Sequence, residues 1–191
     1  MTTQTKTKRK TESKIEDLPT NPFAFEVLQL VSKQRSNAKK VEILQKYEDP
    51  SLKTILIWNF DESVISLLPV GEVPYASTGE QNSFSGTLSN KIEDAVSKMQ
   101  ELSTNSLGSS DQGKSSIRKE YHMFYNFVKG GNDSLSSLRR ETMFINILQG
   151  LHPLEAEIVC LVKDKKLETK YKITKEIVSE SYPDIQWGGR S

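Results

Sequence analysis

Residues 36–60 read SNAKKVEILQKYEDPSLKTILIWNF and contain two helix starts in succession. Ser36-Asn37 supplies capping residues, and Asp49-Pro50 places a capping carboxylate directly before a proline that suits the first helical turn. After each start the apolar residues recur at helical spacing. In the first run they are Ala38, Val41, Leu44 and Tyr47, and in the second they are Leu52, Ile55, Leu56, Phe60 and Val64. The stretch therefore predicts two consecutive helices.

The same signals recur in both directions from this stretch. We expect further helices after Asn21-Pro22, over 88–102, over 117–128, after a cap at Ser134 or Ser137, after Pro153 and after Thr174. Together with the two above, the pattern predicts about eight helices. The expected fold class is mainly α, either one compact helical domain or two small helical halves.

Composition divides the chain into four parts. Residues 1–20 are Thr, Lys and Glu with little to bury, which predicts a disordered N-terminal arm. Residues 21–102 form an N-terminal helical half that includes an extended segment at 69–85, where prolines and a glycine break the helical pattern. A Ser/Gly linker follows at 103–115, and a C-terminal helical half occupies 116–191.

Length and charge exclude several classes of protein. No apolar run approaches the roughly 18 residues of a membrane span, and the start lacks the hydrophobic region of a secretory signal. A single cysteine among 191 residues excludes an internal disulfide. Net charge is +1, but residues 52–102 hold seven acids and three bases, whereas residues 114–176 hold twelve bases and eight acids. This asymmetry favours either a polyanionic partner for the C-terminal part or an ordinary surface of uneven sign.

One stretch matches a nucleotide-binding pattern. Residues 108–115, GSSDQGKS, fit the P-loop at every specified position, with Gly108 and Gly113 for the turn, Lys114 for the outer phosphates and Ser115 for magnesium. A P-loop needs a buried strand before it, and Ser/Thr/Asn-rich residues precede this one. We therefore interpret the match as part of a flexible linker, and expect no catalytic residues, no enzyme activity and no cofactor.

Two basic segments are the candidates for anion or nucleic-acid contact. Lys129, Gly130 and Gly131 form a turn before a helix that carries Arg139 and Arg140, an arrangement that can bind an anion. The same residues can be a glycine C-cap followed by a serine N-cap, without a ligand. Further along, Lys170 and Lys172 precede the last helix. These two and Lys175 would lie near phosphates if residues 154–178 form a helix-turn-helix, or on an ordinary surface if these helices only pack together.

No metal site is expected. His122 and His152 lie thirty residues apart, with no helical partner spacing and no second cysteine. Cys160 lies among Ile, Val and Leu, which predicts a buried small hydrophobe.

Several blocks resemble a family of uncharacterised proteins encoded by tailed bacteriophages, including large contractile-tailed phages of marine bacteria and cyanobacteria. The blocks are 37–48 (NAKKVEILQKYE), 51–75 (SLKTILIWNFDESVISLLPVGEVPY), 127–133 (FVKGGND) and 138–187, where RRETMFINILQGLHPLEAEIVCLVKDKKL is the most recognisable part. The family has no assigned activity, so the resemblance implies a phage product in the host cytoplasm and no catalytic residues. A location in the virion is the alternative to the host cytoplasm.

We therefore expect a non-enzymatic binding or accessory protein that acts during infection beside nucleic-acid machinery. Its partner would be a phage or host protein, or nucleic acid, and not a membrane. A virion or assembly component that docks through residues 69–85 is one alternative. A P-loop nucleotide-binding protein is the other.

Overall fold

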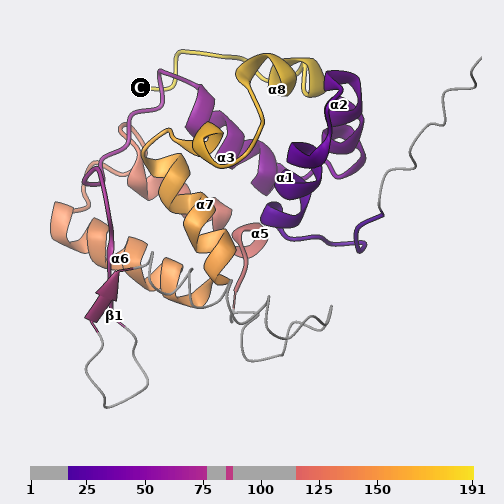
Figure 1. The fold of residues 1–191 in the computed structure, drawn as a ribbon. Coiled ribbons are helices and arrows are strands. Elements are labelled where there is room, and N and C mark those ends of the chain that lie inside the picture. Colours follow the sequence, from indigo (N-terminus) through magenta and orange to yellow (C-terminus); the bar gives the residue numbers. More distant parts are fainter. Residues whose placement is uncertain (1–16, 77–84, 88–114) are drawn as a thin grey trace, which may run out of the picture.

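The computed structural model describes residues 17–76, 85–87 and 115–191, and these residues are mainly helical (Figure 1). The α-helices are α1 (Ala24–Lys33), α2 (Asn37–Lys46), α3 (Pro50–Phe60), α5 (Ile117–Glu120), α6 (Ser137–Gly150), α7 (Pro153–Lys163) and α8 (Lys175–Ser181). Two 3-10 helices are η1 (Tyr121–Phe127) and η2 (Leu167–Thr169), and the short strands β1 (Pro74–Ala76) and β2 (Ser85–Thr87) pair antiparallel. The predicted mainly α fold is confirmed.

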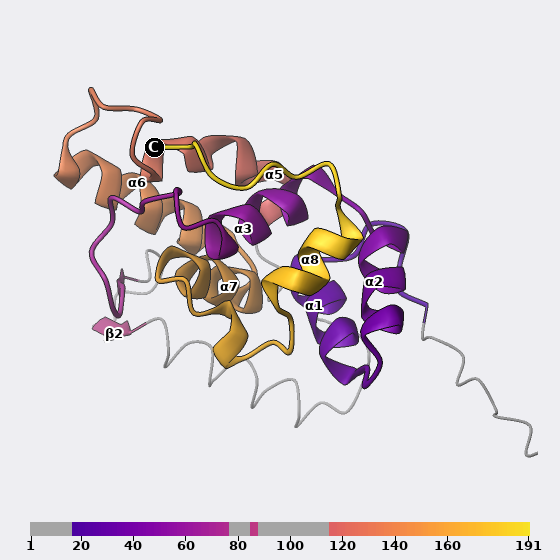
Figure 2. The same ribbon diagram turned by 90° about the horizontal axis from the view of Figure 1, so that it is seen from above.

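The helices pack around α3 and α7, which contact each other. Figures 1 and 2 show α1, α2 and α8 on one side of this central pair and α6 on the other. Helix α2 contacts α1 and α8, and α7 contacts α1 and α6. Elements from the two ends of the described chain are therefore neighbours in space.

One hydrophobic core joins residues that lie before and after residue 103. The ring of Trp58 on α3 lies 5.7 Å from the ring of Phe124 and 6.4 Å from that of Phe127, measured between centroids. The largest fully buried side chains come from both parts: Leu28, Ile43, Leu44, Ile55, Leu56, Ile117, Phe127, Phe144, Leu148, Ile158, Tyr171 and Tyr182. Of the two arrangements that the sequence allowed, the compact helical domain is the one observed.

Several predicted helix starts are confirmed, two of them with a side-chain cap. Ser36 precedes α2, and the carboxylate of Asp49 accepts a hydrogen bond from the backbone N–H of Ser51 at the start of α3. Pro153 opens α7 after His152, whose Nδ1 accepts from Leu154 N–H, and Thr174 precedes α8. At Asp49 and His152 the side chain caps the helix that a proline opens, whereas Ser36 and Thr174 precede their helices without a side-chain cap bond.

Other predicted boundaries were wrong. Helix α1 begins at Ala24 rather than at Asn21-Pro22, because the Glu26 carboxylate accepts from Phe23 N–H and caps the helix there. Helix α3 ends at Phe60, before Val64, because Asp61 turns out of the helix. Helix α6 is capped by Ser136, neither Ser134 nor Ser137, and the predicted helix over 117–128 is one α-turn followed by η1.

The chain between α3 and β1 is extended and pairs with a later segment. Leu67 N–H donates to the Phe127 carbonyl at 2.8 Å, and Lys129 N–H donates to the Ile65 carbonyl at 2.9 Å. These two bonds fix the turn that follows Phe127 against the segment after α3.

Four predictions lie wholly or partly outside the described residues: the arm up to residue 16, residues 77–84 of the extended segment, the helix over 88–102, and the linker except for Ser115. Residues 17–20 were assigned to the arm, but two of them contact α2 and its C-cap residue. Leu18 N–H donates to the Tyr47 hydroxyl at 2.8 Å, and Asp17 pairs with Lys46. No helix among the described residues is both long and apolar enough to cross a membrane.

Candidate nucleic-acid interface

Residues 170–175 (KYKITK), here called the lysine strap, connect η2 to α8. Burial alternates along it, because Tyr171 and Ile173 are 2% and 1% exposed while Lys170 and Lys172 lie on the surface. Ile173 N–H donates to the Tyr171 carbonyl at 2.9 Å, so the chain turns tightly at Lys172. The apolar residues fasten the strap to the core, and Lys170 and Lys172 face water.

The strap is held against the turn between α1 and α2. Lys172 N–H donates to the Ser32 hydroxyl at 3.0 Å, and that hydroxyl donates to the Leu28 carbonyl at 2.8 Å. On the other side, the buried Lys40 donates from Nζ to the Lys172 carbonyl at 2.6 Å. Two hydrogen bonds therefore hold the backbone of Lys172 beside α1 and α2, and a third anchors the Ser32 hydroxyl to α1.

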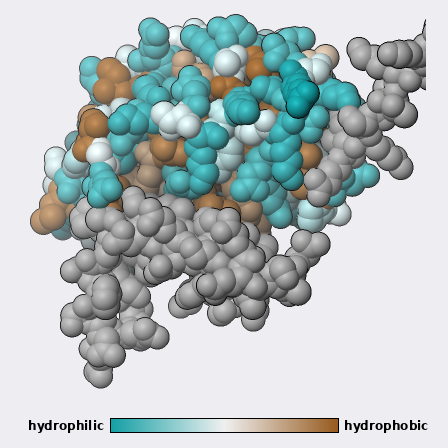
Figure 3. Space-filling view, in the orientation of Figure 1, coloured by the Kyte–Doolittle hydropathy of each residue, from teal (hydrophilic) through white to brown (hydrophobic). Residues whose placement is uncertain are grey.

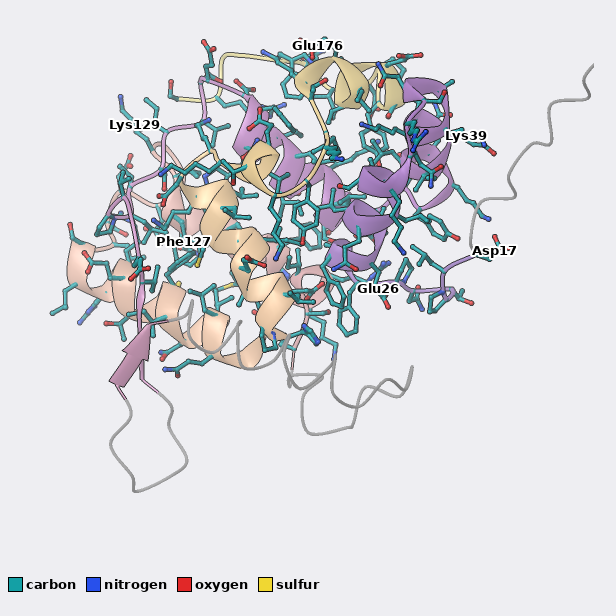
Figure 4. All side chains as sticks on the ribbon, in the orientation of Figure 1. Asp17, Glu26, Lys39, Phe127, Lys129 and Glu176 are labelled. Carbon is teal, nitrogen blue, oxygen red and sulfur yellow. The ribbon has the colours of Figure 1, made fainter. Side chains whose placement is uncertain are left out.

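This contact brings the strap beside α1 and α2, which carry further bases close in the sequence to Ser32 and Lys40. We define the basic patch as six bases. Three lie in or between α1 and α2, and three lie in the strap: Lys33, Arg35, Lys39, Lys170, Lys172 and Lys175. Figure 4 shows Lys39 on the outer side of α2. Within the patch Lys170 pairs with Glu157, and Lys175 lies 5.1 Å from the centre of the Trp187 ring. Glu168 and Glu176 flank the strap in the sequence, and the six bases beside them are the groups that suit a polyanion.

Sequence reasoning named Lys170 and Lys172 but missed Lys33, Arg35 and Lys39. In the local sequence these three residues look like ordinary surface bases. The two hydrogen bonds that place α1 and α2 beside the strap join residues 132 and 140 positions apart. Only the tertiary structure assembles the patch.

The predicted turn at Lys129, Gly130 and Gly131 lies elsewhere; Figure 4 shows Lys129 and Lys39 on opposite sides of the molecule. Gly130 has φ +79°, a conformation that favours glycine. At Gly131 a Cβ atom would lie 1.8 Å from the Tyr125 carbonyl oxygen. The two glycines therefore have conformational and packing roles, and the turn is not joined to the strap as one site.

Arg140 differs most from the expectation of an anion contact. It is only 6% exposed, and its Nε donates to the Asn126 carbonyl at 2.8 Å. Its Nη2 donates to the carbonyls of Asn132 at 3.1 Å and Leu135 at 2.9 Å. This corrects the sequence-based assignment, because the guanidinium ties down the turn before α6 instead of facing a ligand. Arg139 is exposed, on the groove described below.

Of the nucleotide-binding pattern, Gly108, Gly113 and Lys114 lie outside the described residues. Ser115 is described, and its hydroxyl donates to Glu120 at 2.5 Å. Its N–H donates to the Gly150 carbonyl at 2.8 Å. The N–H thus ties the chain before α5 to the end of α6, and the hydroxyl bonds to the last residue of α5.

Glu155 is the described acid whose pKa is raised clearly above its ordinary value. It is 1% exposed at the wall of a cavity of about 310 Å³, and burial raises its pKa to about 7 even though backbone hydrogen bonds and Arg118 oppose the shift. A buried carboxyl with such a pKa can signal an acid–base catalyst. Here Oε1 accepts from Ala24 N–H at 3.1 Å and Oε2 from Ile117 N–H at 2.8 Å. Both oxygens are used to hold the starts of α1 and α5, which is a structural role.

The described residues contain no group of three or more His, Cys, Asp or Glu placed to hold a metal ion. His152 caps α7 and stacks on Phe25 with ring centroids 4.7 Å apart. Cys160 is half-buried rather than fully buried. Burial raises the pKa of its thiol to about 12, which keeps it protonated at neutral pH.

Comparison with known proteins gives one family-level result. The model of a protein family, described as a family of unknown function, matches residues 27–102 and 102–169. The match covers more than half of the chain. Comparison with curated proteins and with solved structures gives no match.

Proposed function

This chain belongs to that family, DUF6433, and we propose that it is a non-enzymatic accessory protein that binds nucleic acid through the basic patch. In this proposal it is the product of a tailed phage and acts in the cytoplasm of the infected host, beside the machinery that handles nucleic acid. The phage origin rests on the resemblance of the sequence blocks given above.

The position of Lys172 carries the proposal. The buried residues Tyr171 and Ile173 and the bonds to Ser32 and Lys40 hold the backbone of Lys172 in place, and its side chain is exposed. Cations held in place lose less freedom when they meet phosphate than cations on a mobile tail would. Such contacts are independent of base sequence and position the protein on the backbone of the nucleic acid.

The non-enzymatic part of the proposal is supported by the use of the buried ionisable groups. Glu155 accepts two backbone hydrogen bonds, and Asp61 accepts bonds from Ser63, Gly188 and Arg190. Lys163 donates to the carbonyls of Pro69 and Gly71 and to the carboxylate of its neighbour Asp164. Each of these groups stabilises a junction between segments.

The dependence of nucleic-acid affinity on salt tests the proposal. The double variant Arg35→Ala, Lys172→Ala removes two charges from the patch, and Lys119→Ala, Lys129→Ala removes two exposed charges elsewhere. We expect the slope of log affinity against log salt to fall by about 0.9 for each phosphate that the protein no longer neutralises, in the patch variant only. An affinity that does not change between low and moderate salt, or equal effects of both variants, would contradict the proposal.

Capture of a tagged copy from infected cells, with and without nuclease, separates the two classes of partner. Recovered proteins that disappear after nuclease treatment support binding to nucleic acid. A partner protein that survives nuclease would make this chain an adaptor for that protein instead.

A virion or assembly component is the second candidate, because the extended segment after α3 exposes apolar side chains. Val70 is 82% exposed and Ile65 is 43% exposed. Such residues could dock on a neighbouring protein in a particle. Mass spectrometry of purified particles decides this candidate by the presence or absence of the chain.

A further inference from the structure

Within residues 17–76, 85–87 and 115–191, helix α6 has two apolar faces, and only one of them packs into the core that these residues form. Phe144 and Leu148 are 2% and 0% exposed on the inner face. On the second face Leu138 is 76% exposed, and a groove of about 640 Å³ runs beside it. The apolar lining of this α6 groove consists of Met123, Leu135, Leu138, Met143 and Ile147. Figure 3 shows hydrophobic surface at the left edge of the molecule, where α6 begins.

The groove runs along one face of α6. Residues 138, 139, 142, 143, 146, 147 and 150 of α6 line it, which is the i, i+3, i+4, i+7 spacing of one helical face. They extend along most of a 14-residue helix, which is about 21 Å long. A second helix of similar length can therefore lie along the whole groove.

The two ends of the groove carry opposite charges. Arg139 lies near the start of α6. Glu120 lines the far end, where it accepts a hydrogen bond from the hydroxyl of Ser115, whose N–H donates to the Gly150 carbonyl. A surface with a base at one end and an acid at the other complements itself after a rotation of 180° about an axis through its middle.

We propose that this groove binds a second copy of the same chain, with the two α6 helices antiparallel across a two-fold axis. Arg139 of each copy then lies beside Glu120 of the other, and Leu138 of each packs near Ile147 of the other. The antiparallel arrangement also opposes the helix dipoles favourably. One helix pair is a small interface, so the dimer is weak and its population depends on concentration.

Sedimentation velocity across a wide range of protein concentration tests the proposal. Wild type is expected to shift from monomer to dimer as concentration rises. Leu138→Asp is expected to raise the dimer dissociation constant by about tenfold or more, since it places a charge in the apolar contact. Val70→Asp is the matched control, because Val70 is 82% exposed and is not part of the groove. Circular dichroism confirms that both variants remain folded.

A charge exchange distinguishes the two-fold arrangement from other contacts. Arg139→Glu and Glu120→Arg should each weaken the dimer, and the double variant should bind more tightly than either single variant, because both ion pairs re-form with reversed sign. A wild type that remains monomeric at every concentration overturns the proposal. A dimer that is indifferent to Leu138→Asp, or not restored by the double exchange, overturns it too, and would leave the groove to another helix.

Discussion

The ammonium group of Lys40 donates a 2.6 Å hydrogen bond to the carbonyl oxygen of Lys172, which lies 132 residues later in the chain. Lys40 is 8% exposed, whereas Lys172 lies on the surface. One lysine thus has a structural role in positioning another. The position of the basic patch depends on a residue that is itself buried.

Replacing Lys40 with methionine keeps the aliphatic stem but removes this hydrogen bond. We expect the free energy of unfolding to fall by about 2 kcal/mol, the usual contribution of a hydrogen bond to a charged group. Affinity for nucleic acid should also fall, because Lys172 loses one of its supports. Urea unfolding and a binding titration measure the two effects. Lys46→Met is the control: its partner Asp17 lies at the surface, so we expect little change in either quantity.

Asp61 predicts a loss of stability in acid. Burial tends to raise its pKa, but hydrogen bonds from Ser63, Gly188 and Arg190 outweigh this and lower the pKa from 3.8 to about 2. Because the folded state holds the ionised form more tightly, the stabilisation is fully present above pH 4. It disappears as pH falls toward 2 and amounts to at most about 2 kcal/mol.

The comparison variant is Asp61→Asn, which cannot ionise. The difference in unfolding free energy between wild type and Asp61→Asn should shrink as pH is lowered from 4 to 2. Hydrogen exchange should show faster opening of residues 188–190 in the variant, since Gly188 and Arg190 lose their carboxylate partner. A pH-independent difference would contradict the prediction.

Glu155 predicts the opposite pH dependence. Its pKa is raised from 4.5 to about 7, so the folded state keeps a proton that the unfolded chain releases near pH 4.5. This group's contribution is therefore most favourable below pH 4.5, and about 3 kcal/mol of it is lost as pH rises through 7. In Glu155→Gln that loss is absent. Wild type should therefore lose stability relative to the variant between pH 5 and pH 8, as measured by denaturant unfolding at each pH.

Alanine substitutions at two glycines test the cost of a steric clash and the cost of backbone strain separately. Gly131→Ala would place a Cβ atom 1.8 Å from the Tyr125 carbonyl oxygen, a clash with backbone that requires the turn to move. We expect it to cost about 3 kcal/mol of unfolding free energy. Gly71→Ala has open space around its Cβ but a φ of +102°, so strain alone should cost about 1 kcal/mol. Thermal unfolding of both variants would contradict this account if Gly71→Ala were the more damaging.

The starts of helices could be predicted from the sequence where a side chain close in the sequence caps the helix. Asp49-Pro50 and His152-Pro153 each combine a side-chain cap with a proline in the first turn, and both helices begin there. The start of α1 was misplaced because Glu26, three residues after Phe23, replaces the cap expected from Asn21. Two local signals competed, and the sequence does not rank them.

The candidate site could be predicted only in part. Lys170 and Lys172 are exposed bases, as the sequence predicts, but their neighbours across the α1–α2 turn come from a contact that no spacing rule encodes. Arg140 was expected to contact an anion because it lies on the helix that follows the turn at Lys129, Gly130 and Gly131. Its burial depends on three carbonyls that converge only after residues 126–135 have folded back.

The pairing of α2 with α8 has a consequence for synthesis on the ribosome. The Tyr182 hydroxyl donates to the Leu44 carbonyl at 2.8 Å, across 138 positions of the chain, and α2 contacts α8. While translation proceeds, the side of α2 that faces α8 has no native cover until residues 175–182 have left the exit tunnel. The nascent chain therefore exposes apolar surface for most of its synthesis, and should bind chaperones until the last helix emerges and closes the core.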